Sequence, residues 1–310
     1  MLAIDELGFV RSSAARQMRG GTSGCFAAVV LDASNPFSTE TVRGLEDALH
    51  EQGCTVMVCS TDGSPEREAS YLTRLEEQRV EGIAIIPATK SLRHLETLRE
   101  RGTLVVLMDR ESADGEFSSV SVDHARGGEL AARHLLDLGH RKIAFINGPV
   151  HLSQCAERRR GVRRAVRKAN LKADECIVEY AIDPITAYEQ AATSVDELLA
   201  LEERPTAIIC VNDLTAFTVL RALSARRVRV PRDISVVGYD DVEFAAMLTP
   251  GLTSIRQSNY ELGRAAAALL IAEASGSSEP HSKVRFEPEL VERQSTTARA
   301  RLNRYSPGGD

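Results

Sequence analysis

The feature that most constrains the fold of this chain is a regular alternation of short apolar runs with longer amphipathic segments. Apolar runs of four to eight residues between turn-forming residues are typical of buried strands. In the first third of the chain we expect such strands at residues 26–31, 55–59, 83–86 and 104–108. The segments between them predict amphipathic helices, each closed by a later glycine, at residues 39–52, 65–78 and 92–101. This order predicts a parallel sheet with helices on both faces.

The same alternation continues through the rest of the chain. We expect helices at residues 125–138, 155–169, 186–201 and 214–226, alternating with strands at residues 143–146, 176–181, 207–211 and 235–237. A helix at 260–274 and one strand at 284–291 then follow two completed halves of similar length. This late pair suggests that the chain crosses back and interlocks the halves. The crossover strands would act as a hinge on which two lobes close around a ligand.

Composition limits the class of protein. The chain has 310 residues, of which 43% are hydrophobic and 26% charged, which is ordinary for a globular protein with two cores. It contains no apolar stretch of about 20 residues, and its N-terminus has neither a basic leader nor a long apolar core, so we expect a cytoplasmic protein. The formal charge of −6 argues against a surface that attracts nucleic acid everywhere.

The sequence predicts neither a metal nor a cofactor, and it predicts no enzyme. Six cysteines are scattered without a CxxC pair, which is typical of small buried side chains in a reducing compartment. The seven histidines share no metal-ligand spacing. G-x-S-x-G, H-E-x-x-H, P-loop and strand-linked G-x-G-x-x-G motifs are all absent.

Polar side chains follow two of the expected strands in the second half. Carboxylates and amides just beyond the carboxyl ends of parallel strands face the crevice where open α/β sheets bind small polar ligands. We expect the Asp240 carboxylate to accept hydroxyl groups of a sugar or a ribose, with a helix cap as the alternative, and Asp241 to be the cap. Asn212 offers a donor and an acceptor to a polyol, with a helix cap as the alternative, and Asp213 is expected to cap the next helix.

Five further residues are candidate contacts of the same ligand. Asp109 and Arg110 follow a strand and would orient a polar ligand, or form a salt bridge between the lobes. Phe37 would stack on a sugar face or a base, or be an ordinary packed aromatic. Ser153 and Gln257 are expected to form hydrogen bonds at the mouth of the crevice.

The arginine-rich segment 158–168 allows two interpretations. It resembles a patch for nucleic acid, but Val162, Ala165 and Val166 form an apolar stripe at helical spacing. The stripe favours a solvated outer face of an amphipathic helix.

Residues 1–23 do not fit the alternating scheme. Residues 2–7 have the pattern of a helix end, and Ser12-Ser13 provide an N-cap for a six-residue helix at 14–19. So short a helix needs a partner, either its own copy in a dimer or a nucleic-acid groove. The charges nearby are the basic Arg11, Arg16 and Arg19.

Ordered motifs along the chain resemble the lactose-repressor/galactose-repressor (LacI/GalR) family of bacterial transcription regulators. Residues 4–9 are similar to the end of a DNA-binding headpiece, and residues 13–21 to a hinge helix. The match continues through Asp32-Ala33-Ser34-Asn35-Pro36-Phe37, Leu138-Gly139-His140-Arg141-Lys142-Ile143-Ala144, Asn212-Asp213, residues 234–241, Leu252-Thr253-Ser254-Ile255 and residues 289–296.

The resemblance implies two interlocked Rossmann-like lobes with parallel sheets, of the periplasmic-binding-protein type. Residues 24–122 with 257–285 would form the N-terminal sensor lobe, and 123–256 with 286–298 the C-terminal one, between a headpiece remnant with hinge helix at 1–23 and a tail at 299–310. It also implies paired hinge helices that enter the minor groove of operator DNA, where Met18 wedges between base pairs. Contacts with DNA would come from Ala15, Arg16 and Arg19.

Two departures from the family pattern affect these expectations. Only the last residues of a helix-turn-helix headpiece precede the hinge, so we expect the chain as written to lack a recognition helix. Ala156 stands where the family commonly has an arginine that points into the effector crevice. Either Arg158 or Arg159 replaces that arginine, or the effector lacks the group it would bind.

The sequence thus predicts the effector-sensing region of a DNA-binding regulator, acting as a homodimer that binds operator DNA when the headpiece is present. A small polar effector, a sugar or a nucleoside-like molecule, would change the spacing of the hinge helices. The alternative is a solute-binding protein of a transport system, against which the basic hinge segment argues. A stand-alone enzyme is a third possibility.

Overall fold

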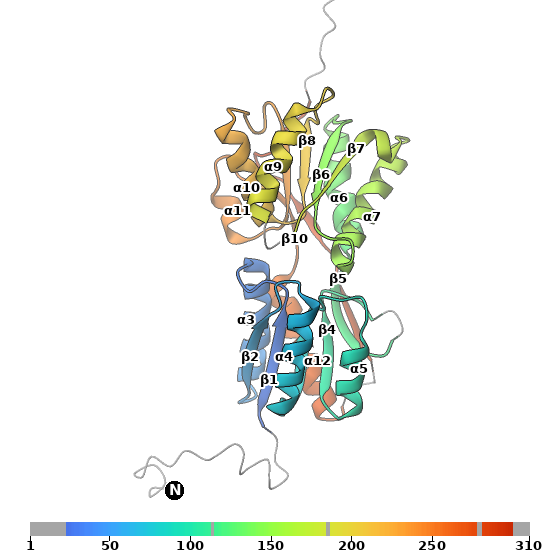
Figure 1. Cartoon of the computed structure of the whole chain (residues 1–310), viewed down its shortest axis with the longest axis vertical. Coiled ribbons are helices and arrows are strands. Elements are labelled where there is room, and N and C mark those ends of the chain that lie inside the picture. Colours follow the sequence, from blue (N-terminus) through green and yellow to red (C-terminus); the bar gives the residue numbers. More distant parts are fainter. Residues whose placement is uncertain (1–22, 113–114, 184–186, 278–280, 300–310) are drawn as a thin grey trace, which may run out of the picture. The chain divides into compact units, whose positions relative to one another are not determined.

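The computed structural model describes residues 23–112, 115–183, 187–277 and 281–299. These residues form two compact units. Unit 1 contains the described residues up to Val122 together with Ser258–Phe286, and unit 2 contains Asp123–Gln257 with the described residues from Glu287 onward. The chain therefore passes between the units three times, as the sequence colouring of Figure 1 shows.

Unit 1 is a six-stranded parallel sheet flanked by helices. Its strands lie in the order β2-β1-β3-β4-β5-β11, and every pair is parallel. The strands are β1 (Cys25–Val30), β2 (Thr55–Ser60), β3 (Gly82–Ile85), β4 (Leu104–Met108), β5 (Ser118–Val122) and β11 (Lys283–Phe286). The helices are α3 (Pro36–His50), α4 (Pro65–Glu77), α5 (Arg93–Glu100) and α12 (Asn259–Ala274).

Unit 2 repeats this architecture with the strand order β7-β6-β8-β9-β10-β12. Only β12 is antiparallel to its neighbour β10. The strands are β6 (Ile143–Asn147), β7 (Ile177–Ala181), β8 (Ala207–Cys210), β9 (Ser235–Asp240), β10 (Thr253–Arg256) and β12 (Glu289–Val291). The helices are α6 (His124–Asp137), α7 (Ser153–Lys168), α8 (Ala173–Cys176), α9 (Ala187–Ala200), α10 (Asp213–Ala225) and α11 (Glu243–Met247).

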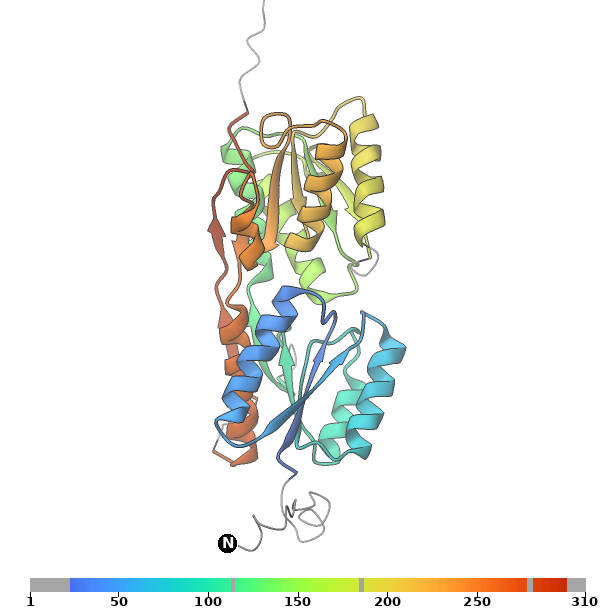
Figure 2. The same cartoon turned by 90° about the vertical axis from the view of Figure 1, so that its left-hand side faces the viewer.

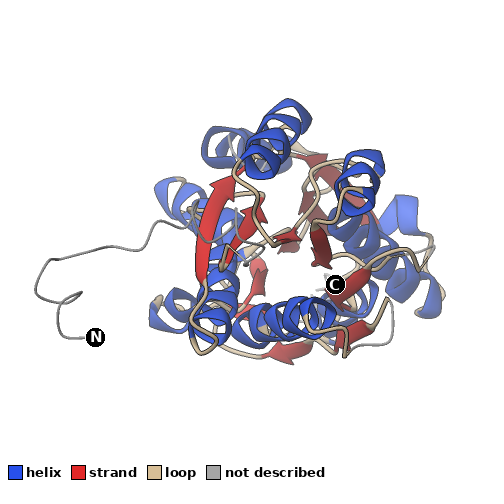
Figure 3. Ribbon diagram, turned by 90° about the horizontal axis from the view of Figure 1, so that it is seen from below, coloured by secondary structure: helices blue, strands red, loops and turns tan. Residues whose placement is uncertain are grey.

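Helices cover both faces of each sheet, as the blue helices around the red strands in Figure 3 illustrate. In unit 1, α3 and α12 bury Leu45 and Leu270 against one face, and α4 and α5 bury Leu72 and Leu95 against the other. In unit 2 the corresponding layers are α6 with α7 and α9 with α10. The strands are buried on both faces, which explains their nearly continuous apolar runs.

In each unit, one pair of helices packs closely through glycines. In unit 1, Gly44 of α3 and Gly263 of α12 face the backbone of the other helix, and a Cβ at either would overlap a carbonyl oxygen. Gly128 of α6 and Gly161 of α7 have the same role in unit 2. Figure 2 shows α3 running alongside α12 in unit 1. Only glycine permits this backbone separation.

The α/β fold class with mostly parallel sheets agrees with the sequence prediction, but several elements differ. The single strand predicted at 284–291 is wrong: β11 joins the sheet of unit 1, and β12 joins that of unit 2. Pro288 lies between them and has no amide hydrogen for a sheet ladder. Strand β5 was not predicted, because serines break its apolar pattern. Helices α8 and α11 were not predicted either. The predicted headpiece remnant and hinge helix lie outside the described residues.

Candidate functional site

The carboxyl edge of the unit 2 sheet brings together the predicted site residues of the second half of the chain. Strands β6, β8, β9 and β10 are parallel, so their carboxyl ends meet at one edge. Asn212 follows β8, Asp240 ends β9, and Gln257 follows β10. Ser153 begins α7 after β6, and its hydroxyl lies 3.4 Å from the side-chain oxygen of Gln154. This edge is the candidate ligand site.

Asp240 and Gln257 form a buried polar pair at this edge. Gln257 Nε2 donates to Asp240 Oδ1 over 2.7 Å, and the two residues are only 4% and 3% exposed, respectively. The backbone of Asp240 has a φ of 107°, which L-residues rarely adopt. Gln257 Oε1 is buried and has no hydrogen-bond partner among the described residues. The pair therefore offers an unused acceptor beside a carboxylate.

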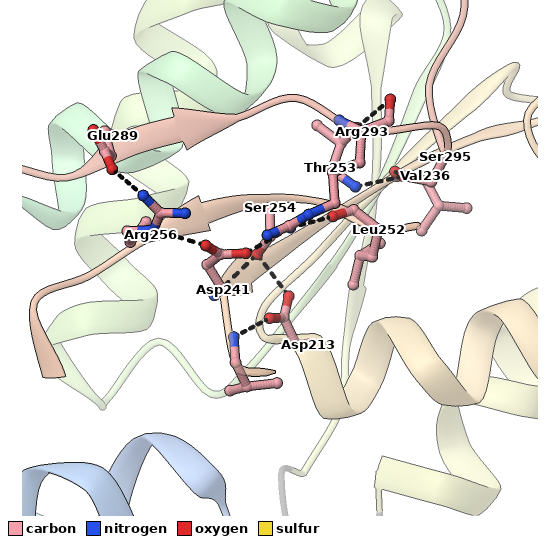
Figure 4. A network of polar contacts seen from close by, with 11 residues as sticks. Asp213, Val236, Asp241, Leu252, Thr253, Ser254, Arg256, Glu289, Arg293 and Ser295 are labelled. Atoms are coloured by element: carbon pink, nitrogen blue, oxygen red, sulfur yellow. Dashed lines mark hydrogen bonds and ion pairs between the residues drawn. The ribbon is translucent and has the colours of Figure 1, made fainter. Parts of the chain in front are cut away.

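The structure assigns the helix cap to Asn212, one of the two roles predicted for it, and not to Asp213. Asn212 is the N-cap of α10, because its side chain accepts from the Thr215 amide over 2.8 Å. Asp213 does not cap that helix. Its carboxylate is fully buried and accepts from the Val242 amide and from the Ser254 hydroxyl, over 2.9 and 2.7 Å. Figure 4 shows this carboxylate pointing toward Ser254.

The surroundings of Asp213 favour its protonated form. Burial, followed by the charge of Asp240, holds the pKa of Asp213 well above its usual range. Gly238 of β9 leaves the space that this carboxyl group occupies, because a Cβ there would overlap Asp213 Oδ1. Asp213 is therefore built into the fold beneath the edge and is not part of its exposed rim.

Asp241 is not a helix cap either. The N-cap position of α11 is Val242, which makes no side-chain capping bond. The Asp241 carboxylate instead accepts from Arg256 Nε over 2.8 Å and from Arg293 Nη1 over 2.6 Å. Arg256 also pairs with Glu289 of β12 over 2.6 Å (Figure 4). These ion pairs tie the loop after β9 to β10 and to the last described segment.

Arg158 is a buried cation at the same edge, for which the sequence analysis offered either a solvated outer face or a replacement of the family's crevice arginine. It is 6% exposed, and its guanidinium carbon lies 3.7 Å from the centre of the Tyr239 ring. Its Nη1 donates to the Val211 carbonyl over 2.5 Å, and its Nε lies 3.5 Å from His124 Nδ1. The solvated-face prediction is therefore wrong for Arg158.

A sequence signal for Arg158 was available. Arg158 precedes Val162, Ala165 and Val166 by four, seven and eight residues, so it lies on the apolar stripe of α7. An arginine on that stripe must be buried with its helix. His124 and Tyr239, its neighbours, carried no signal of their own in the sequence.

The unit 1 candidates lie at the carboxyl edge of their own sheet. Phe37 is in the first turn of α3, and its ring is 6% exposed within the core. Asp109 follows β4, is 3% exposed and has a φ of 54°. Arg110 donates to the carbonyl oxygens of Thr89 and Lys90 over 2.6 and 2.8 Å. It thereby fixes a loop of its own unit. The predicted hinge contacts Ala15, Arg16, Met18 and Arg19 lie outside the described residues.

The described part of the chain has neither a metal centre nor a membrane-spanning helix. It contains no group of three or more His, Cys, Asp or Glu side chains placed to hold a metal ion. None of its helices is both long and apolar enough to cross a membrane. Its six cysteines are free, and three of them are buried.

Comparisons with known proteins give the family. Residues 132–296 match the family described as "Periplasmic binding protein-like domain". The transcriptional repressor PurR of Vibrio atlanticus is 33% identical over 295 residues, which cover 94% of this chain and 86% of that protein. PurR of Aliivibrio fischeri is also 33% identical, over 96% of this chain and 88% of its own length.

Solved structures agree with the sequence relatives. A LacI-family regulator from Enterococcus faecium with bound ribose matches with a TM-score of 0.81 and 27% identity, over 89% of this chain and 100% of that chain. The complex of the regulator CelR with cellobiose matches with a TM-score of 0.79 and 29% identity, over 94% and 88%.

The fold thus defines a two-unit α/β protein of the periplasmic-binding-protein-like class. Within that class, the chain belongs to the LacI/GalR family of ligand-sensing transcriptional regulators. Its named relatives are transcriptional regulators.

Proposed function

We propose that this protein is a repressor whose effector is a small polyhydroxylated molecule, such as a sugar, bound at the carboxyl edge of the unit 2 sheet. The observation that carries the proposal is the buried Asp240–Gln257 pair, with its strained aspartate backbone and unused amide oxygen. A carboxylate accepts two hydroxyl groups of one sugar ring, which is the chemistry expected at such an edge.

The balance of donors and acceptors favours a ligand that donates hydrogen bonds. Asn147 ends β6, and its Nδ2 donates to the Cys155 carbonyl over 3.2 Å, while its buried Oδ1 has no partner among the described residues. With Gln257 Oε1, this gives the edge two unsatisfied acceptors in addition to the Asp240 carboxylate. Buried acceptors without partners are unfavourable, so a hydroxyl-rich ligand gains from filling them. The Arg158 guanidinium would supply the donor for a ring or glycosidic oxygen.

The unit 1 candidates enter the proposal as secondary contacts. Asp109, at the end of β4, would accept further hydroxyl groups, and Phe37 and Arg110 would shape that edge. Asn212 retains its side-chain amide group for the ligand, because its cap bond uses the oxygen. Ser153 would donate or accept through its hydroxyl.

Control of transcription would follow from differential affinity. An effector that binds one arrangement of the two units more tightly shifts the population toward it. In our proposal this changes the spacing of the hinge helices at residues 14–19 and hence their fit to operator DNA. Met18 would be the minor-groove wedge, with Ala15, Arg16 and Arg19 beside it.

We also propose that the protein acts as a homodimer through the α11 side of unit 2. Phe244 and Met247 on α11 are 55% and 65% exposed, which is unusual for such large apolar side chains. The chain after α11 borders a hollow of about 660 Å³ that is lined partly by Phe217, Leu220 and Leu248. Exposed apolar side chains close in sequence to a hollow with apolar and basic lining suit a two-fold, self-complementary contact. Met247→Asp should lower the dimer fraction in sedimentation velocity.

The decisive experiment is a thermal-shift screen of the full chain against ribose, xylulose, cellobiose and a panel of nucleosides. A ligand at 100 times its Kd should stabilise the protein by about 2.7 kcal/mol. Asp240→Asn, with about tenfold weaker binding, should reduce the stabilisation to about 1.4 kcal/mol at the same ligand concentration, whereas the surface variant Asp233→Asn should retain it in full. A panel without any shift, or an undiminished shift in Asp240→Asn, would contradict the proposal.

A further inference from the structure

The outer side of the α6–α7 pair carries a concentration of positive charge that the effector site does not use. We name it the α6–α7 basic face. It consists of Arg126 and Arg133 on α6 and of Arg160, Arg164, Arg167 and Lys168 on α7. Ion pairs place the two rows side by side, because Arg164 and Lys168 of α7 both reach Glu129 of α6.

The acids within this face neutralise only part of its charge. Glu129 is nearly buried and receives Arg164, Lys168 at 2.7 Å and Arg126 at 3.9 Å. The bond from Lys168 is the largest of the influences that lower the pKa of Glu129, so this carboxylate is ionised at neutral pH. Glu157 lies 3.4 Å from Arg160. Asp137 lies one turn after Arg133 on α6, so six cations face three carboxylates, on a chain whose formal charge is −6.

The neighbouring side of α7 is built differently. Arg159 and Arg163 point away from α6 and are matched by acids of the β7 side: Glu179 receives both of them, and Asp174 also receives Arg163. Excess charge is therefore confined to the α6–α7 basic face and is not a general property of this helix.

The excess positive charge of the α6–α7 basic face is not needed to hold the two helices together. Arg133 and Arg167 are exposed and have no ion pair or hydrogen bond with any residue that the structure describes. The two helices are held together by the Gly128 and Gly161 contacts and by buried side chains such as Val162. Unpaired arginines so close together repel one another, which is tolerated where a partner supplies the opposite charge.

We propose that the α6–α7 basic face binds an acidic segment of another protein. Arginine predominates, and its planar fork matches carboxylate groups. Residues 160–168 span about 12 Å along the helix axis, the length of roughly four residues of extended chain, so alternate glutamates of one short segment can reach successive arginines. The face has no aromatic side chain on which nucleobases could stack, and Glu129 and Glu157 would oppose a continuous row of phosphates.

Fluorescence anisotropy with a labelled twelve-residue peptide of alternating glutamate and glycine tests the proposal on the full chain. We expect saturable binding that weakens with added salt, and about tenfold weaker binding for Arg160→Gln/Arg167→Gln. The matched control is Arg204→Gln/Arg232→Gln, which removes two exposed arginines elsewhere in unit 2 and should change affinity less than about twofold.

Three results would overturn the proposal. Equal weakening in the control would mean that total charge, and not this face, governs binding. If the peptide does not bind even at low salt, the α6–α7 basic face does not recognise acidic segments. Tighter binding of a random-sequence DNA duplex that also depends on Arg160 and Arg167 would assign the face to nucleic acid instead. Circular dichroism and the effector-induced thermal shift should be unchanged in both variants, which separates this test from the proposed effector function.

Discussion

Unit 1 and unit 2 share a scaffold and differ in the chemistry at its carboxyl edge. Their sheets have equivalent strand orders, so that β1, β3 and β4 of unit 1 correspond to β6, β8 and β9 of unit 2. Both units also contain a helix pair packed through facing glycines. The framework is therefore repeated almost in full, including its closest backbone contacts.

The edges resemble each other at one position and diverge at others. Asp109 after β4 and Asp240 at the end of β9 occupy equivalent places, are equally buried and both have positive φ values. In unit 1 the charged neighbours hold a loop: Glu68 accepts from the Ala88 amide over 2.6 Å, and Arg110 binds two carbonyls. In unit 2 the edge retains unpaired acceptors. The difference teaches that the scaffold and the ligand chemistry can vary independently.

The largest effect should come from the glycines that the units share. Gly44→Val in unit 1 and Gly161→Val in unit 2 would each drive a side chain into the backbone of the partner helix. We expect either variant to lose at least about 3 kcal/mol of unfolding free energy, because overpacking at backbone contacts cannot relax through side-chain movement. Urea unfolding followed by circular dichroism measures this. Glu40→Ala, on an exposed turn of α3, is the control, and a glycine variant as stable as that control would break the equivalence of the two frameworks.

A smaller but still large effect is expected at the Asp213 carboxyl group, which is fully buried beneath the edge of the unit 2 sheet. Asp213→Ala would leave the Val242 amide and the Ser254 hydroxyl without their acceptor, with a loss of about 3 kcal/mol. Asp213→Asn retains a hydrogen-bond acceptor but has no carboxyl group that can titrate. In the same urea experiments at pH 5, the free energy of unfolding should be highest for wild type, lower for Asp213→Asn and lowest for Asp213→Ala. An alanine variant as stable as wild type would mean that the buried carboxyl group does not hold this loop.

The pH dependence of Asp213 has a defined sign. Its folded-state pKa is raised, so the folded protein keeps a proton that the unfolded chain releases, and the contribution to stability declines as pH rises above the unfolded value. The stability difference between wild type and Asp213→Asn should therefore decrease from pH 4 to pH 8. Asp233 behaves oppositely, because Arg229 lowers its pKa to about 2. Its contribution should be lost as pH falls toward that value.

An intermediate effect should distinguish the two equivalent aspartates. We expect Asp240→Asn to weaken binding of the sugar identified in the screen about tenfold or more, because a charge-assisted acceptor is lost beside the unpaired Gln257 oxygen. Asp109→Asn should weaken it less, by about threefold, as a secondary contact. Isothermal titration calorimetry gives both values. Equal losses of affinity in the two variants would mean that Asp109 and Asp240 contribute equally to sugar binding.

The smallest effect is expected for exposed ion pairs that each unit has between helices. Arg264 of α12 pairs with Glu51 just after α3, and Arg226 after α10 pairs with Asp196 of α9. Solvent screens such pairs, so Arg264→Gln and Arg226→Gln should leave the urea midpoint within experimental error. A clear loss in one unit only would show that surface charge contributes unequally to the two frameworks.

The sequence was sufficient for the scaffold because buried parallel strands impose continuous apolar runs. It failed where burial does not require apolar residues. Strand β5 consists of Ser118–Val122, whose small serines fit between neighbouring strands without an apolar signal. It failed also at 284–291, where alternation continued across a proline that separates two sheets. Periodicity predicts a strand but not the sheet that it joins.

The sequence predicted side chains that do lie at the carboxyl edge of the unit 2 sheet, but it misassigned their neighbours Asp213 and Asp241. If α10 began one residue later, Asp213 and not Asn212 would occupy its N-cap position. Asp213 is instead buried because its carboxylate accepts from Ser254 and Val242, which lie far away in the sequence. Asp241 likewise finds its arginines 15 and 52 residues further along the chain. Such pairings depend on tertiary structure. Arg158 differs, because its place on the apolar stripe could be read from spacing alone.

The three passages of the chain between the units have a consequence for biosynthesis. Unit 1 begins first but lacks α12 and β11 until residue 286 has been made, whereas unit 2 has every element except β12 once residue 257 has been made. On the ribosome, the second unit can therefore approach its final fold while the first still exposes the apolar face that α12 will cover. Unit 1, although it starts first, would therefore still lack a helix and a strand when unit 2 lacks only one strand, and in that interval the nascent chain would depend most on chaperones.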